Sequence, residues 1–343
     1  MATRSAQPVR SGLLFELMTG FKGTAVLRSA IDLEVFDAVA ALQPAASADA
    51  VAKRLDADPR GIRLLLGALA GLGLLTADEG SFQLAPGVDE LLLTTSSRYC
   101  GGISRVASSY REWHALGRLT ETVRTGRPVP GTDAAAPDFD YWADFATYTT
   151  FATEKGAALL ERALSQWLAG RRQVRILDVG AGSGAYGLRL AESDVTASVT
   201  LQDWPSVLDI GMRNANQRGL SARVTPLPGD VFSINLHGPY DVIVVGNLLF
   251  LFSPQRAQEL VTRLAASLQP GGVLAIVSFT TGPDPLADQH AHLLNLLMLS
   301  WTPQAEILSA QAYLDMTAGP GLVDGRVFTA PGSPLKVILA RKP

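Results

Sequence analysis

Apolar side chains recur at every third or fourth position through much of the first hundred residues. This spacing places them on one helix face and predicts helices over residues 13–18, 24–39, 48–55 and 59–71. Ser47 and Asp58 stand just before two of these helices, where a side-chain oxygen can accept from free backbone N–H groups. Pro59 suits a first helical turn. The N-terminal part is therefore predicted to be mostly helical.

Two short apolar runs, Leu74–Thr76 and Phe82–Leu84, flank an acidic turn and predict a hairpin. Helices followed by a hairpin are typical of a winged-helix domain, which we place at residues 1–98, so a DNA-binding or ligand-sensing regulator has to be considered. The candidate recognition helix carries Arg60 and Arg63, but Asp56 and Asp58 lie beside them. Without a basic stripe to hold phosphates, we expect no nucleic-acid partner.

Residues 99–168 are predicted to form linking helices, interrupted by a loop over 126–138 that is rich in Pro, Gly, Asp and Ala. The aromatic residues of this section are Tyr110, Trp113, Phe139, Tyr141, Trp142, Phe145, Tyr148 and Phe151. Most such rings pack into a core, because aromatic side chains bury large apolar areas. The alternative is that several of them wall a substrate pocket.

From residue 169 onwards, β-branched runs alternate with helix-like segments. The runs predicted as strands cover residues 176–179, 199–202, 224–227, 241–245 and 273–279. Helices are predicted over 186–191 and 254–268, and 269–272 read as a helix stop and turn. A final hairpin is predicted from 325–329 and 335–340. This alternation favours an α/β fold with a largely parallel sheet.

Composition agrees with a globular protein of about two domains, since the chain has 343 residues and 47% of them are hydrophobic. The net charge of −3 offers nothing to a polyanion. A single cysteine, Cys100, excludes an internal disulfide framework and favours a reducing, cytoplasmic location. Because no apolar run approaches the roughly 20 residues needed to span a bilayer, we expect no membrane partner.

The first predicted strand of the α/β part runs into an acid and three alternating glycines. Residues 176–185 read Ile-Leu-Asp-Val-Gly-Ala-Gly-Ser-Gly-Ala, and such a turn lets the backbone approach an adenosine-type ligand closely. Gly180, Gly182 and Ala185 also fit the dinucleotide pattern, and a tight turn without any ligand is a third interpretation. Asp178 favours a cationic ligand, such as an amino-acid ammonium, and therefore S-adenosylmethionine (SAM) over NAD.

Two further predicted strands also end in acids. Asp203 follows the glycine turn by about 20 residues, where a ribose-binding acid is expected. Asp230 follows the third strand, where its carboxylate can accept from the adenine amino group while Val231 and Phe232 pack the ring. Each acid alone could be a solvated turn residue, but the order and register of these features argue against coincidence.

With these motifs the chain resembles the small-molecule SAM-dependent O-methyltransferases, whose bacterial members modify polyketides and other aromatic metabolites and whose plant members methylate phenolics. The resemblance covers nearly the whole chain and rests on 178–184, 203–205, 229–232 and 268–272. It implies a Rossmann-like SAM-binding domain over 169–343 behind a winged-helix dimerisation domain. It implies cofactor contacts from Asp178, Gly180, Gly182, Asp203, Trp204, Asp230, Val231, Phe232 and Asn247.

The resemblance also implies a homodimer, and the apolar helices before Ala40 exceed what one small domain can cover. Members of the family build the acceptor pocket from the linking helices and from the helix before the last strands, here His290–Trp301. The residues expected in this pocket are Trp142, Phe145, Tyr148, Thr149, Phe250, Asn295 and Met298.

The catalytic histidine of the family has no counterpart at its usual place. Family members carry a Leu-His-Asp-Trp-like segment after the fourth strand, and its histidine takes the acceptor hydroxyl proton. Here residues 246–254 read Gly-Asn-Leu-Leu-Phe-Leu-Phe-Ser-Pro, so Phe250 stands at the histidine position. Glu306 falls near the family's His-orienting carboxylate and has no imidazole there to orient.

Of the four histidines, only His290 and His292 lie on the predicted pocket helix. One of them could replace the missing base; the alternative is that they hydrogen-bond substrate or backbone. Two positions apart on a helix, they face different directions, so we expect no metal site.

Two enzymatic interpretations follow. In the first, the protein methylates a small aromatic or polyketide-like acceptor, most often on oxygen, at a nucleophile that needs no strong base: a carboxylate, an acidified phenol, an enolisable carbon or an amine. Holding donor and acceptor in line then supplies most of the catalysis. In the second, the same fold performs hydroxylation, decarboxylation or cyclisation, which a phenylalanine at the base position also fits.

Overall fold

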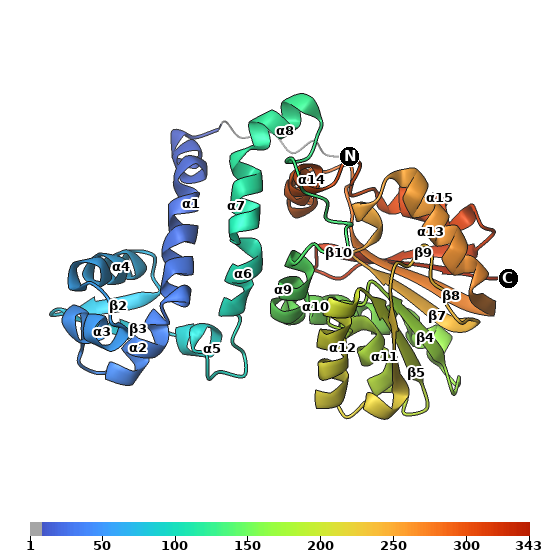
Figure 1. The fold of residues 1–343 in the computed structure, drawn as a ribbon, viewed down its shortest axis with the longest axis horizontal. Coiled ribbons are helices and arrows are strands. Elements are labelled where there is room, and N and C mark those ends of the chain that lie inside the picture. The colour runs from blue at the N-terminus through green and yellow to red at the C-terminus, as the bar shows by residue number, and fades with distance from the viewer. Residues whose placement is uncertain (1–8) are drawn as a thin grey trace. The chain divides into compact units, whose positions relative to one another are not determined.

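The computed structural model describes residues 9–343 (Figure 1). The chain divides into two compact units, the first ending at Ser109 and the second beginning at Tyr110. The helices predicted to link two domains are therefore shared between the units. The side chain of Phe151 lies outside the described part. None of the helices within residues 9–343 is long and apolar enough to cross a membrane.

The first unit is mostly helical, with a small antiparallel sheet in the order β1-β3-β2. Ser47 Oγ accepts from Ala50 N at 3.2 Å and Asp58 Oδ1 accepts from Gly61 N at 2.7 Å, which confirms the two predicted caps. The elements are α1 (Ser11–Asp32), α2 (Val35–Leu42), β1 (Ala46–Ser47), α3 (Ala48–Leu55), α4 (Pro59–Gly71), β2 (Leu75–Asp78), β3 (Ser81–Leu84), α5 (Val88–Leu92), η1 (Gly101–Ile103) and α6 (Ser104–Ala107).

The boundary predicted between the first two helices was wrong. Helix α1 runs unbroken through Gly20 and Gly23, and the chain turns only at Glu34, whose φ is 55°. A glycine inside a helix costs only about 1 kcal/mol, so it does not by itself end one. The first half of α1 leaves apolar side chains in solvent, with Leu17 71% and Met18 78% exposed.

The second unit contains a seven-stranded sheet in the order β6-β5-β4-β7-β8-β10-β9. The first five strands of this order are parallel, while β10 is antiparallel to both β8 and β9. The strands are β4 (Arg175–Val179), β5 (Ser198–Asp203), β6 (Val224–Pro228), β7 (Tyr240–Gly246), β8 (Leu268–Phe279), β9 (Val323–Phe328) and β10 (Leu335–Arg341). This is the predicted α/β sheet with its closing hairpin.

Helices cover both faces of the sheet. Side chains alternate along a strand, so Ile176 and Val242 pack with α10, α11 and α12, while Leu177 and Ile243 pack with α13 and α15. The helices of this unit are α7 (Tyr110–Gly117), α8 (Leu119–Thr125), α9 (Tyr141–Tyr148), α10 (Thr150–Leu168), α11 (Ala185–Ser193), α12 (Pro205–Gln217), α13 (Pro254–Ala266), α14 (Gln289–Trp301) and α15 (Ala310–Ala318), with short turns η2 (Ser221–Arg223) and η3 (Leu249–Leu251).

The turn predicted over 269–272 was wrong, because β8 already begins at Leu268. Gly271 N donates to Lys342 O at 2.9 Å, and Lys342 N donates to Gly272 O at 2.8 Å. The glycine-rich segment is thus hydrogen-bonded to Lys342, about 70 residues later in the chain. The local sequence of the segment does not reveal this partner. Helix α15 was also missing from the predicted elements.

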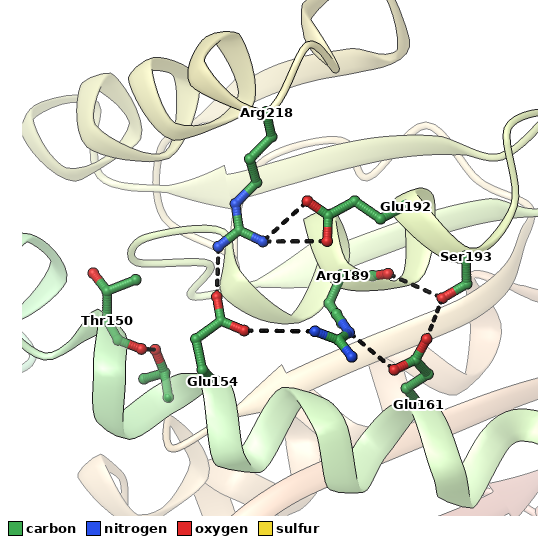
Figure 2. A network of polar contacts seen from close by, with 8 residues as sticks. Thr150, Glu154, Glu161, Arg189, Glu192, Ser193 and Arg218 are labelled. Carbon is green, nitrogen blue, oxygen red and sulfur yellow. Dashed lines mark hydrogen bonds and ion pairs between the residues drawn. The ribbon is translucent and has the colours of Figure 1, made fainter. Parts of the chain in front are cut away.

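A polar network joins three helices on one side of the sheet. Figure 2 shows Arg218, just after α12, between Glu154 of α10 and Glu192 of α11. Its Nη2 lies 2.5 Å from Glu154 Oε1, and its Nη1 lies 3.3 Å from Glu192 Oε1. Arg189 of α11 donates to Glu161 of α10 at 2.9 Å. The network therefore ties α10 to α11 and α12, the two helices that follow β4 and β5.

Candidate active site

A cavity of about 420 Å³ lies in the second unit, where β4, β5, β6 and β7 end. Ligands of open α/β sheets bind at this edge, beyond the carboxyl ends of the strands. The cavity has two halves of different chemistry. The strand-end half is lined by Gly180, Ala181, Gly182, Ser183, Ala185, Tyr186, Gln202, Asp203, Trp204, Val207, Gly229, Asp230, Val231, Phe232, Gly246, Asn247, Leu248 and Arg256. The other half is mostly aromatic.

The glycine turn after β4 needs its glycines. Gly180, Gly182 and Gly184 have φ of 60°, 55° and 75°, in the left-handed region that other residues rarely adopt. A Cβ on Gly180 would also meet the Leu248 side chain at 3.0 Å. The turn therefore brings bare backbone to the cavity wall, as the sequence motif predicted.

Asp203 holds this turn in place. Its Oδ2 accepts from Gly182 N at 2.8 Å, and its Oδ1 accepts from Trp204 N at 2.7 Å. Burial raises the pKa of Asp203 to about 6, although both backbone hydrogen bonds lower it. A carboxylate that is buried at a cavity wall and poorly solvated is well placed to accept hydrogen bonds from a ligand.

Gln202 was not among the predicted site residues, although it directly precedes Asp203. Its Oε1 accepts from Gly180 N at 3.3 Å, and its Nε2 donates to Gly229 O at 2.7 Å. One amide thus links the glycine turn to the loop that carries Asp230. The sequence signal that could have predicted Gln202 as a site residue is an amide side chain at the end of an apolar strand, directly before the strand-end acid.

Asp178 lies behind the glycine turn and does not line the cavity. The side chain is fully buried, and its Oδ2 accepts from Gly187 N, in the first turn of α11, at 2.8 Å. Its Oδ1 has no hydrogen-bond partner in the part of the chain that the structure describes. Burial raises the pKa of Asp178 to about 7, and the charge of Asp203 adds to this. Contact between Asp178 and a ligand ammonium stays a prediction.

The loop after β6 is fixed by arginines of α13. Arg263 Nε donates to Val231 O at 2.9 Å, and its Nη2 donates to Ile234 O. The Arg256 guanidinium stacks 3.7 Å from the centre of the Phe232 ring. Within the loop, Asp230 Oδ1 accepts from Phe232 N at 2.9 Å. Asp230, Val231 and Phe232 therefore reach the cavity together on a braced loop.

The strand-end half fits SAM. The same wall carries the Asp203 carboxylate, the glycine turn and Asp230 beside the Phe232 ring. These are the groups that the sequence predicted for this ligand. Asn247 adds a further polar group: its φ is 52°, and its Oδ1 is buried without a partner among residues 9–343. Buried unpaired oxygens are uncommon in proteins, and one beside this wall is consistent with a polar ligand.

The aromatic half of the cavity comes from α9, η3 and α14. Of the residues expected in the acceptor pocket, Trp142, Phe145, Thr149, Phe250 and Met298 line it. Tyr141 and Trp301 also do so, and their ring centres lie 4.6 Å apart. Sequence reasoning left Tyr141 among possible core aromatics and named Trp301 only as a helix end. The Trp142 indole donates to Ala134 O at 2.7 Å, which fixes the adjoining loop.

Four residues predicted for the aromatic half do not line the cavity: Tyr148, Asn295, His290 and His292. The Asn295 amide is occupied elsewhere, because its Oδ1 accepts from Ile307 N at 2.6 Å. His290 is exposed and packs against Phe279 with ring centres 4.9 Å apart. His292 Nε2 is buried without a partner among the described residues. A catalytic role for either histidine stays a prediction.

Phe250 lies at the cavity wall, on η3, and is only 5% exposed. Among the described residues that line the cavity, none is a histidine, and the carboxylates are Asp203 and Asp230 of the strand-end half. The aromatic half offers one titratable group, Tyr141, whose OH donates to Glu112 Oε1 of α7 at 3.0 Å. Burial raises the pKa of Glu112 to about 7, and the Tyr141 hydrogen bond opposes this shift.

Two protein-family models match the chain, one in its N-terminal part and one in its α/β part. Residues 15–93 match the O-methyltransferase dimerisation domain, and residues 176–272 match a methyltransferase domain. Mouse acetylserotonin O-methyltransferase is 30% identical, over 90% of this chain and 82% of its own length. The 3-hydroxy-5-methyl-1-naphthoate 3-O-methyltransferase of Streptomyces sahachiroi is 27% identical, over 94% and 92%.

Solved structures show the same fold. Human N-acetylserotonin methyltransferase in complex with SAM aligns with a TM-score of 0.79 at 23% identity, covering 100% of this chain and 99% of that chain. PigF with S-adenosylhomocysteine (SAH) aligns with a TM-score of 0.82 at 24% identity, covering 97% and 100%.

These matches decide between the interpretations of the sequence. The relatives are methyltransferases by name, so the non-methylating alternative is not favoured. The N-terminal match is to a dimerisation domain, which does not favour a DNA-binding or ligand-sensing regulator. The chain belongs to the SAM-dependent O-methyltransferase family.

Proposed function

We propose that the protein transfers the methyl group of SAM to a hydroxyl oxygen of a small aromatic or polyketide-like molecule, without a histidine base. The observation that carries this proposal is the aromatic half of the cavity, where Phe250 occupies the wall next to the strand-end half. The whole cavity, with both halves, has a volume of about 420 Å³, which is in the usual range for small-molecule sites. The relatives named above act on a hydroxynaphthoate and on acetylserotonin.

For the cofactor, the donor set of the strand-end half supports an assignment by part. Asp203 would accept from the ribose hydroxyls, and Asp230 with Val231 and Phe232 would hold the adenine. Gly180 and Gly182 would face the methionine part, together with Asn247, Trp204 and, from behind the turn, Asp178. The SAM sulfonium supplies an already activated methyl group, so the protein has to align the acceptor with it and exclude water.

For assembly, we propose a homodimer that pairs through α1. Six large apolar side chains in the first half of this helix are between 46% and 78% exposed: Leu13, Leu14, Phe15, Leu17, Met18 and Phe21. A continuous apolar surface of this kind marks an association site rather than a solvated face. The match of residues 15–93 to a dimerisation domain supports the same conclusion.

Turnover with defined acceptors tests the proposed reaction. Purified protein is incubated with SAM and either acetylserotonin or 3-hydroxy-5-methyl-1-naphthoate, and mass spectrometry follows SAH and the methylated product. The matched controls are the same molecules with the hydroxyl already methylated. We expect SAH to accumulate with the free hydroxyl compounds only. Equal SAH formation with the methylated controls, or none with either compound, would contradict the proposal.

A further inference from the structure

Methylation of a neutral hydroxyl releases a proton, and the aromatic half of the cavity offers little to receive it. Its wall is built from alanine, proline, aromatic, leucine, methionine and threonine side chains. Within the described part of the chain, Tyr141 is the one residue of this half whose side chain titrates. It lies on α9 and is 7% exposed, so bulk water does not solvate it freely.

The Tyr141 hydroxyl is held by a carboxyl group. Its OH donates to Glu112 Oε1 at 3.0 Å, across 29 residues of sequence, from α9 to α7. The Tyr141 ring is itself held edge-on by Trp301, 4.6 Å away, and by Trp142, 5.3 Å away. The phenol oxygen of this cavity-lining residue is thus held by a partly buried carboxyl group, and it keeps lone pairs that can accept a proton.

We propose that Tyr141 and Glu112 are the proton acceptor of the reaction, with Tyr141 touching the acceptor and Glu112 acting through it. This inference rests on the proposed function. The acceptor oxygen forms its bond to the methyl carbon as the carbon–sulfur bond breaks, and that bonding pair stays on sulfur. The acceptor proton passes to the Tyr141 oxygen, while the original Tyr141 proton passes to Glu112 Oε1. Glu112 then loses the proton to solvent.

The acidities of the two groups suit a relay. Burial and then the charge of Glu112 raise the pKa of Tyr141 far above its usual value, so Tyr141 is a neutral phenol at pH 7. Tyr141 therefore cannot act as a stored base and has to pass a proton on. Glu112, with its pKa raised to about 7 by burial, is a stronger base than an ordinary glutamate, and its ionised fraction exceeds one half only above about pH 7.

Burial is the largest cause of the raised pKa of Glu112. Other titratable or charged groups on α7, and on α8, α9 and α14 next to it, are Tyr110, Arg111, His114, Glu121, Arg124, Asp144, Tyr148, His290 and His292. The Tyr141 hydrogen bond acts against burial and lowers the pKa of Glu112. Arg111 is paired instead with Asp140, at 2.5 Å.

The test compares the pH dependence of kcat in three variants with the wild type. Methyl transfer to acetylserotonin or 3-hydroxy-5-methyl-1-naphthoate is measured at saturating SAM from pH 5.5 to 9. In the wild type, kcat should rise with pH and level off above an ionisation near 7, because Glu112 accepts the proton only when ionised. Glu112→Gln and Tyr141→Phe should each lower kcat at pH 8 by roughly 10²-fold, the usual worth of a general base, and remove that ionisation. Glu121→Gln removes an exposed carboxylate on α8 and should change neither.

A purely structural role for the pair gives a different result. If Glu112→Gln or Tyr141→Phe keeps the wild-type pH profile, or changes KM while kcat is unchanged, the relay is excluded. An infrared titration of the wild type minus Glu112→Gln checks the carboxyl group without turnover, and a carboxyl band that titrates near pH 4.5 would also exclude the relay. If the wild type methylates neither compound, the proposed function fails and the relay fails with it; an unchanged pH profile in an active enzyme defeats the relay alone.

Discussion

The backbone N–H of Glu306 donates a hydrogen bond to the backbone carbonyl oxygen of Phe250 at 3.1 Å. The two residues predicted to occupy the family's base and base-orienting positions are therefore neighbours in space, although 56 positions separate them in the sequence.

Placing a histidine at position 250 should create an ionisation of its own, measured in a Glu112→Gln background that lacks the native step near pH 7. Phe250→His puts an imidazole at the cavity wall, and its unperturbed pKa of about 6.5 should appear as a new step in the pH profile of kcat. Phe250→Leu removes the ring without adding a base and should show no such step. A profile identical in Phe250→His and Phe250→Leu would mean that residue 250 does not face the reacting hydroxyl.

Asp203 should be needed for SAM binding. A carboxylate bonded to the ribose hydroxyls contributes roughly 1.5–3 kcal/mol for each charge-assisted hydrogen bond. Asp203→Asn should therefore raise the Kd for SAM by about 10²-fold or more. Asp209→Asn, an exposed acid on the following helix α12, is the control and should bind like the wild type. Calorimetric titration with SAM measures the Kd of both variants. Equal affinity for SAM in Asp203→Asn and the wild type would show that Asp203 is not part of the cofactor site.

The ligand-free protein should lose stability as pH rises from about 4 to about 7. Burial raises the pKa of Asp178 to about 7 and that of Asp203 to about 6, both above the ordinary value of 3.8. In this window the folded state binds more protons than the unfolded state, so the free energy of unfolding falls with increasing pH. Glu161 and Asp194, whose pKa values are lowered, act in the opposite direction but only below about pH 4.5.

Urea unfolding at pH 5 and pH 7.5 measures this effect without SAM. Asp178→Asn should weaken this dependence, because the asparagine has no proton to lose between these pH values, while Asp203 and Glu112, whose pKa values are also raised, keep part of it. A wild type that is more stable at pH 7.5 than at pH 5 would show that these carboxyl groups do not have the raised pKa values that their burial causes.

Sequence patterns located the strand-end half of the site because its signals are local. An acid at a strand end and alternating glycines before a helix define positions within a few residues, and Asp203 and Gly182 both line the cavity. The aromatic half depends on contacts between distant segments. Tyr141 donates to Glu112, and Asn295 Oδ1 accepts from Ile307 N. Neither contact produces a periodic pattern in the sequence.

The same distinction explains the errors in the fold. The cap of α3 at Ser47 is a local feature and was predicted correctly. The end of helix α1 at the turn before Glu34 was not predicted. An apolar helix face usually indicates burial within the same domain, but the apolar residues in the first half of α1 are exposed. The glycines at 271 and 272 suit a turn by themselves, and their hydrogen bonds to Lys342 lie too far along the chain for a local pattern to reveal.

The exposed face of α1 should hold two chains together. Static light scattering on a sizing column should give about twice the chain mass of 36.3 kDa. The double variant Leu17→Glu, Met18→Glu places charges at two strongly exposed apolar positions and should yield monomers. Val195→Glu, at an equally exposed valine of the second unit, should stay dimeric. A wild type that elutes and scatters as a monomer at micromolar concentration would contradict the proposed pairing.

Transfer of an isotopically labelled methyl group tests the proposed reaction most directly. SAM with a trideuterated methyl group is turned over with acetylserotonin or 3-hydroxy-5-methyl-1-naphthoate, and the product is examined by mass spectrometry and NMR. The account predicts one trideuteromethyl group per product molecule, bound to the oxygen of the former hydroxyl, with one SAH formed for each. Label on carbon or nitrogen, or a changed acceptor without label, would contradict it.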